Sequence, residues 1–107
     1  MTGVRVVLCT VPEDKARDLS DTMLREGLAA CVNFLGPVTS RYVWQGAIEE
    51  AREVLLLIKT SAERVAALRQ RVVALHPYQV PEVIEVSVEG GHPPYLQWVL
   101  DTCSQAR

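Results

Sequence analysis

The sequence predicts an α+β fold of the ferredoxin-like kind, in which one antiparallel sheet carries helices on one face. The first observation is that the hydrophobic residues follow strand and helix periodicities in the order β-α-β-β-α-β. The second is that one further helical pattern follows at the C-terminus. Right-handed crossovers and a tight hairpin then place all four strands in one sheet. At this length we expect a single domain over residues 1–107.

The first strand and the first helix are separated by a change of hydrophobic period. Residues 4–10 are apolar and β-branched, which indicates a strand buried on both faces. Residues 10–13 match a capping box, and apolar residues then recur at spacings of three and four. This pattern predicts a helix to about Glu26 that stops at Gly27.

Two long strands should form the next part of the chain. Residues 31–44 alternate imperfectly and are broken by Gly36-Pro37, which predicts a strand with a bend or bulge. Gln45-Gly46 is a turn signal, and residues 48–59 return as a strand that is polar at its start. We expect a hairpin whose polar tip projects beyond the domain.

The second half of the chain repeats the helix and strand signals. Residues 60–63 form a second capping box, and the helix that follows should end at His76, which precedes a proline. Residues 84–89 alternate as in a half-exposed edge strand, and residues 93–105 suggest a final helix. The side chains expected to face inward on that helix are Tyr95, Leu96, Val99 and Leu100, with Trp98 as a large additional contact.

The predicted sheet has more apolar surface than its helices can cover. Residues 6–8 and 54–58 place apolar side chains on both faces, whereas the two main helices can cover only one. We therefore expect the second face to be buried in a homo-oligomer. A large exposed apolar patch on a monomer is the less favoured alternative.

Composition excludes several classes of function. A net charge of −2, a pI near 5.6 and the lack of a basic stripe argue against nucleic-acid binding. No apolar run has the length of a membrane span, and the short run near the N-terminus is expected to be a strand rather than a signal peptide. Three widely spaced cysteines, Cys9, Cys31 and Cys103, indicate reduced thiols and a cytoplasmic protein.

The topology brings chemically active side chains together at one edge of the sheet. Cys9 ends the first strand, His76 ends the second helix and Glu82 begins the last strand. All three should lie at the same edge, with the hairpin tip near residues 44–49. Thiolate and neutral imidazole suit copper or zinc better than magnesium or calcium. A helix C-terminus, however, favours a charged imidazolium, which opposes metal binding.

Six motifs, in order and spanning nearly the whole chain, resemble the CutA divalent-cation tolerance family. They are Val-Val-Leu-Cys-Thr (6–10), Leu-Ala-Ala-Cys-Val-Asn (28–33), Ser40-x-Tyr42-x-Trp44-x-Gly46, Leu-Ile-Lys-Thr (57–60), His-Pro-Tyr-x-Val-Pro-Glu (76–82) and Tyr95-Leu-x-Trp98. The resemblance implies a ferredoxin-like protomer in a tight trimer, similar in outline to the PII signalling proteins. It also implies a cytoplasmic protein linked to tolerance of copper and other divalent cations.

The resemblance also implies a set of metal ligands. The copper ligands assigned in the family fall on Cys9 and His76, and Cys31 lies in the other cysteine motif. Some members carry two adjacent histidines, whereas this chain has Leu75 before its histidine. Two ligands do not close a site, so Glu82, water or a neighbouring subunit would supply the third. We therefore expect weak, exchangeable binding.

Each candidate residue has a purely structural interpretation as well. Cys9 and Cys31 are alternatively small core residues, and His76 is alternatively a helix-end cap. The remaining candidates are expected to be structural: Cys103 as packing or an exposed thiol, His92 as a solvated loop residue, and Tyr42 and Trp44 as interface packing.

Three functions compete on this sequence. The first is a metal-binding homotrimer that buffers or senses copper. The second is a PII-like signalling trimer with a small-molecule site in subunit clefts. The third is an interaction scaffold whose hairpin, with Glu49, Glu50 and Glu53, docks a partner. An enzyme fits worst, because the chain has no Ser/His/Asp set and no Gly-rich phosphate loop.

Overall fold

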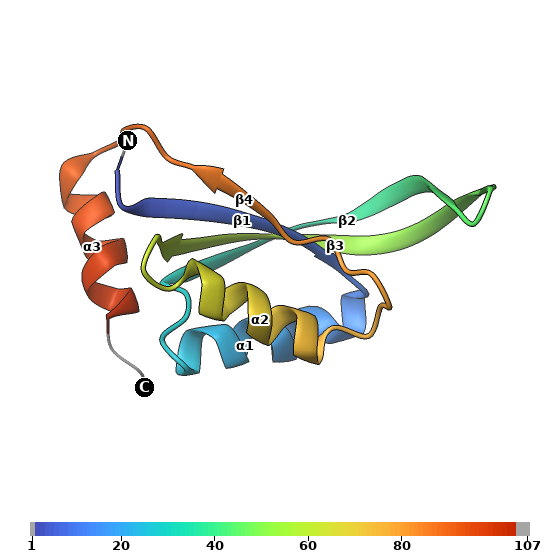
Figure 1. Cartoon of the computed structure of the whole chain (residues 1–107), viewed down its shortest axis with the longest axis horizontal. Coiled ribbons are helices and arrows are strands. Elements are labelled where there is room, and N and C mark those ends of the chain that lie inside the picture. The colour runs from blue at the N-terminus through green and yellow to red at the C-terminus, as the bar shows by residue number, and fades with distance from the viewer. Residues whose placement is uncertain (1, 105–107) are drawn as a thin grey trace.

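A computed structural model describes residues 2–104 as one antiparallel sheet with three α-helices (Figure 1). The elements in chain order are β1 (Val4–Val11), a 3-10 turn (Glu13–Lys15), α1 (Ala16–Arg25), β2 (Cys31–Trp44), β3 (Ala47–Ser61), α2 (Val65–Leu75), β4 (Ile84–Ser87) and α3 (Pro93–Cys103). The order predicted from the sequence is confirmed. The predicted last residue of α3, Gln105, lies outside the described residues.

The strands lie in the order β2-β3-β1-β4, and every neighbouring pair is antiparallel. This is the predicted ferredoxin-like arrangement. Helices α1 and α2 cover one face of the sheet, and α3 packs at the end opposite the hairpin (Figure 1). Strand β4 is short and pairs with β1 only from Arg5 to Leu8, so the last residues of β1 have no β4 partner.

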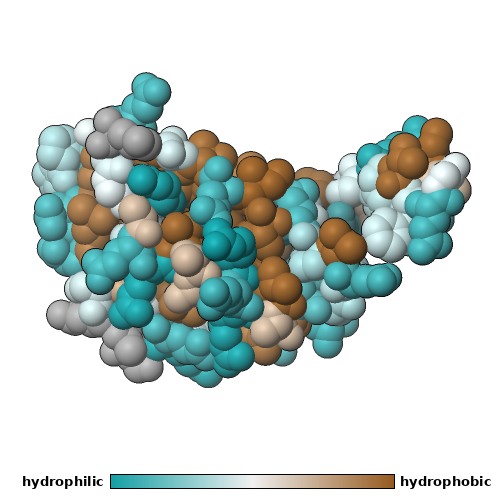
Figure 2. All heavy atoms as spheres, viewed as in Figure 1, coloured by the Kyte–Doolittle hydropathy of each residue, from teal (hydrophilic) through white to brown (hydrophobic). Residues whose placement is uncertain are grey.

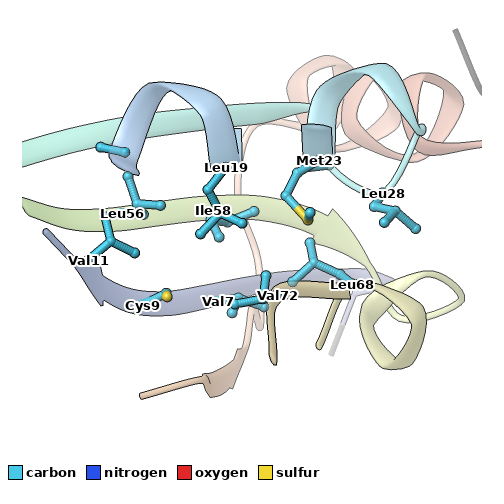
Figure 3. Close-up of a cluster of buried hydrophobic side chains, with 12 residues drawn as sticks. Val7, Cys9, Val11, Leu19, Met23, Leu28, Leu56, Ile58, Leu68 and Val72 are labelled. Carbon is cyan, nitrogen blue, oxygen red and sulfur yellow. The ribbon is translucent and has the colours of Figure 1, made fainter. Parts of the chain in front are cut away.

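The main core lies between the sheet and the two helices. Twelve side chains form it, including Val7, Cys9 and Val11 of β1, which alternate toward the helices. Met23 of α1 and Leu68 of α2 close over them and are fully buried (Figure 3). A second, smaller cluster joins α3 to the start of β1. Burial on this scale contributes roughly 25 cal/mol per Å² of apolar surface, which is why the 3.6-residue stripe decides each helix's orientation.

The β2–β3 hairpin projects well beyond the rest of the protein (Figure 1). Gln45 and Gly46 form its turn with φ angles of 51° and 82°, a backbone conformation that suits glycine and favours a tight hairpin. The register shifts between Leu35 and Val38, around the cis peptide of Gly36-Pro37, where the bend was predicted. The tip is less polar than predicted, because Val43 and Ile48 are among its exposed residues; Figure 2 shows apolar atoms at this end.

Neither predicted capping box forms. Thr10 is paired within β1, opposite Leu55, so its side chain cannot cap α1. The Thr60 hydroxyl instead donates to the carbonyl oxygen of Leu28 at 2.6 Å inside the protein. One residue further along, Ser61 Oγ accepts a hydrogen bond from the backbone N–H of Arg64 at 3.1 Å. The sequence signal for a chain turn was right, but the capping residue was wrong.

The face of the sheet away from α1 and α2 is apolar and largely uncovered. We call it the outer face and define it by Val6, Leu8, Leu35, Leu55, Leu57, Ile84 and Val86, which share one side by strand register. Ile84 is 51% exposed and Val86 43% exposed. The prediction that helices leave one apolar face uncovered is therefore confirmed for the single chain.

Two details of the C-terminal half differ from the sequence prediction. Strand β4 was expected to be half exposed, but all four of its residues are exposed, although Glu85 forms an ion pair with Arg69 of α2. Tyr95 of α3 was expected to face inward, but it is 42% exposed. It stacks on Trp98, which is also exposed, with ring centroids 5.7 Å apart. Among residues 2–104, no helix is both long and apolar enough to cross a membrane.

Candidate functional site

A cleft of about 820 Å³ opens at the base of the hairpin, where the segment after α2 passes β1 and β3. Its lining residues come from three parts of the chain. They are Thr10 of β1, Ser40, Arg41, Tyr42 and Trp44 of β2, Ala51 and Glu53 of β3, and Pro77, Tyr78, Gln79, Val80 and Glu82 of the connection to β4. The two prolines of that connection hold it extended, so its side chains are presented along one wall.

The carboxylate of Glu53 is the most buried charged group in the cleft. Glu53 is only 3% exposed although it belongs to a strand segment that the sequence suggested would be solvated. Its Oε2 accepts a hydrogen bond from the Tyr78 hydroxyl at 2.7 Å. Burial and this carboxylate raise the pKa of Tyr78 well above its usual range, so the phenol stays a donor. The pair joins β3 to the segment after α2.

His76 is fixed by two backbone hydrogen bonds. Its Nδ1 accepts from the backbone N–H of Tyr78 at 3.1 Å, and its Nε2 lies 2.8 Å from the carbonyl oxygen of Thr10. With the Tyr78 N–H directed at Nδ1, Nε2 is the ring nitrogen that faces the Thr10 carbonyl oxygen. His76 caps the part of β1 that β4 does not reach.

Cys9 lies close to this histidine but in the core. Its Sγ is 3.8 Å from the same Thr10 carbonyl oxygen, and its side chain is fully buried among apolar groups (Figure 3). Burial, with smaller contributions from the charges of Glu82 and Glu53, raises the pKa of the thiol from 9.0 to about 12. Relative to an ordinary thiol, forming the thiolate is therefore disfavoured by about a thousandfold.

The structure brings three of the four predicted metal ligands to one corner and leaves the fourth elsewhere. Cys9, His76 and Glu82 lie together, as the topology predicted, but only Glu82 lines the cleft. Cys31 is near the opposite end of the sheet, where the Lys59 Nζ is 3.8 Å from its sulfur. Within the described chain, no group of three or more His, Cys, Asp or Glu side chains is placed to hold a metal ion.

A thiol, an imidazole and a carboxylate are chemical types that bind copper, but the hydrogen bonds and protonation of the thiol and imidazole at this corner oppose binding. The thiol is protonated, and both nitrogens of the imidazole are engaged with backbone groups. A metal ion would have to displace the His76 hydrogen bonds and the Cys9 proton together. This cost is consistent with weak, exchangeable binding and opposes a permanent structural metal.

Comparison with known proteins identifies the family. Residues 5–102 match the family described as CutA1 divalent ion tolerance protein. The chain belongs to the CutA1 family. A CutA1 relative from Thermus thermophilus, described as a divalent-cation tolerance protein, is 46% identical over 95 residues, which cover 88% of this chain and 92% of the relative.

Solved CutA1 structures have the same fold. CutA from Xylella fastidiosa is 43% identical with a TM-score of 0.92, and the match covers 95% of this chain and 99% of that one. A protein from Nostoc described as PII-like CutA in apo form is 30% identical with a TM-score of 0.88, covering 92% of this chain and 96% of that one. The chain spans only 62% and 55% of its Xenopus laevis and Mus musculus relatives.

The contact between two residues of the site, Glu53 and Tyr78, was not predicted from the sequence. Glu53 was a candidate only for docking a partner through the hairpin, and Tyr78 belonged only to the motif at residues 76–82. The available signal was the connection itself, which places a phenol two residues after a helix stop and therefore near the sheet edge. No local pattern marks Glu53, because its burial depends on a residue 25 positions away.

Proposed function

We propose that this CutA1 chain acts in the cytoplasm as a homotrimer in divalent-cation tolerance, and that it binds copper or another divalent cation weakly. Family membership supports the tolerance role. The observation that carries the assembly is the outer face. Ile84 and Val86 are exposed and lie beside Leu8 and Leu57 on this face. Association of copies of the chain would remove this apolar surface from water.

The proposed metal contact is the corner formed by Cys9, His76 and Glu82. Support comes from their convergence on the Thr10 carbonyl region and from the donor types, which suit Cu(I) or Cu²⁺. Cys31 remains a separate soft-ligand candidate on the other side of the subunit. Any further ligand from a neighbouring subunit would make binding depend on the trimer.

A copper titration tests the metal assignment. Cu²⁺ and Cu(I) are titrated into the full chain and into a Cys9→Ser, His76→Ala double variant. His92→Ala is the matched control, because this exposed histidine lies at the start of α3. We expect weak, saturable binding near one metal per chain that the control retains and the double variant loses. Identical, non-saturating curves for all three proteins would contradict the assignment.

A second candidate is a PII-like trimer that binds a small molecule, and the cleft favours it. The volume of about 820 Å³ lies in the range of small-molecule sites. Thr10 and Glu53 belong to the same side of the sheet as Leu55. The cleft therefore adjoins the outer face, and in a trimer that buries this face it would lie beside a subunit boundary.

A further inference from the structure

We propose that the cleft at the base of the hairpin binds a small organic cation, an ammonium group carried on an apolar or aromatic body. The proposal comes from a buried carboxylate, Glu53, that faces a space walled by Tyr42, Trp44 and Tyr78. It rests on the second candidate function above and names the class of ligand that this site would take.

The buried carboxylate has spare hydrogen-bonding capacity directed at the cleft. Tyr78 donates to Oε2 of Glu53, and no described residue donates to Oε1. Since residues 2–104 contain no fully buried side-chain oxygen without a partner, Oε1 must reach the cleft surface. None of the ion pairs among residues 2–104 includes Glu53 or Glu82. A carboxylate that reaches solvent through one oxygen only is incompletely hydrated, so an ammonium group that pairs with this oxygen would be stabilised.

The aromatic walls suit the same ligand. Tyr42 and Trp44 are two residues apart on β2 and therefore point to one side of the hairpin. Tyr78 faces the cleft from the connection after α2. An ammonium group within about 6 Å of such ring faces is stabilised by cation–π attraction, and the rings also cover an apolar body.

The side chains that line the cleft carry a net negative charge, which an ammonium ligand requires. Arg41 is the cationic residue among the lining side chains, but its Nε lies 3.5 Å from Oε1 of Glu50, and both groups are well exposed. Glu53 and Glu82 are the two carboxylates among the lining side chains, and Glu53 is 3% exposed. The inner wall of the cleft therefore presents negative potential to a ligand.

A bare metal ion is a poorer occupant than an organic cation. The cleft is far larger than a coordination sphere, and no described group of three His, Cys, Asp or Glu side chains could enclose an ion. Aromatic rings contribute no ligand that Cu²⁺ or Zn²⁺ prefers. An aromatic wall beside a carboxylate instead matches a molecule with one apolar part and one ammonium part.

The test uses three probes of similar shape and different charge. Phenethylammonium, neutral 2-phenylethanol and anionic 3-phenylpropionate are titrated into the ¹⁵N-labelled full chain, and the amide shifts of Tyr78, Gln79, Val80 and Glu82 are followed. We expect shifts that saturate with phenethylammonium and much weaker effects from the other two. Glu53→Gln should weaken ammonium binding by at least about tenfold. Glu89→Gln, which removes an exposed carboxylate that does not line the cleft, is the matched control and should leave binding unchanged.

A second variant keeps the test decisive if Glu53→Gln folds poorly. Trp44→Leu removes an exposed ring at the cleft and should weaken ammonium binding several-fold while the protein stays folded. The proposal is overturned if neither variant changes binding of phenethylammonium, or if no probe binds because a second copy of the chain fills the cleft.

The outcome also separates this inference from the function on which it rests. If 3-phenylpropionate or 2-phenylethanol binds more tightly than phenethylammonium, and Trp44→Leu weakens that binding, the cleft is a small-molecule site but the ammonium assignment is wrong. The copper titration with the Cys9→Ser, His76→Ala variant is independent of this result, because neither Cys9 nor His76 lines the cleft.

Discussion

Replacing Tyr78 with phenylalanine should destabilise the protein by more than a typical surface substitution. The change removes one hydroxyl, which donates at 2.7 Å to a carboxylate that is 3% exposed. A hydrogen bond to a charged group contributes roughly 1.5–3 kcal/mol, and loss of the donor also leaves Oε2 of Glu53 without a protein partner. Tyr78 itself is 36% exposed, so water can partly replace the donor. We therefore expect a loss of about 2 kcal/mol.

The assay is urea denaturation at a fixed protein concentration, because association adds to apparent stability. Tyr42→Phe is the matched control, since the Tyr42 hydroxyl bonds to none of residues 2–104; it should change the free energy of unfolding by less than about 0.5 kcal/mol. In a Glu53→Gln background, Tyr78→Phe should cost only about 1 kcal/mol, because the acceptor is then neutral. Equal losses in both backgrounds, or a loss no larger than the control's, would refute the coupling.

Three further predictions concern the thiols and the outer face. At pH 8, iodoacetamide should modify half-buried Cys31 much faster than Cys9, as peptide mass spectrometry would show, because Cys9 is fully buried with a pKa raised to about 12. Because the pKa of Cys9 is raised in the folded state, the protonated thiol contributes its full stabilisation below pH 9, and this contribution is lost between about pH 9 and 12. Cys9→Val removes the titrating group, so the free energy of unfolding should fall less steeply over that pH range. Leu57→Glu on the outer face should shift the sedimentation mass toward the monomer, whereas Ala67→Glu on exposed α2 should not. Rapid Cys9 alkylation, an unaltered alkaline profile or an unchanged Leu57→Glu mass would each count against the corresponding argument.

Turn residues with special backbone angles explain why the limits of the strands and helices were largely predictable. Gly27 has a φ of 71° after α1, and Gln45-Gly46 makes the hairpin turn, so special backbone geometry coincides with special residues. The bounds of β2 were predicted without error, and the bend fell at Gly36-Pro37 as expected. Period and turn chemistry are local properties, and local properties can be read from one sequence.

The capping and burial errors have a different cause. Thr10 could not cap α1 because its backbone continues the β1 ladder to Val11, and tertiary pairing outweighs a local capping signal. Glu53 could not be recognised as buried, because its environment comes from Tyr78 in another part of the fold. The full exposure of β4 was likewise not predictable from its alternating pattern, because exposure depends on which elements of the fold pack against the strand.

The prediction for the site was correct in topology and incomplete in chemistry. Cys9, His76 and Glu82 do meet at one edge, because strand and helix ends meet there. Sequence could not show that the thiol faces the core or that both imidazole nitrogens bond to the backbone. Those features depend on side-chain orientation, which strand order alone does not determine.

Native mass spectrometry of the full chain at low micromolar concentration tests the central claim most directly, that the outer face is buried between copies. Each chain has a mass of 11.9 kDa, so the account predicts a dominant species of about 36 kDa, three times that value, that persists on dilution. A dominant 11.9 kDa monomer would contradict the account, because Ile84 and Val86 would then stay exposed to water without a function.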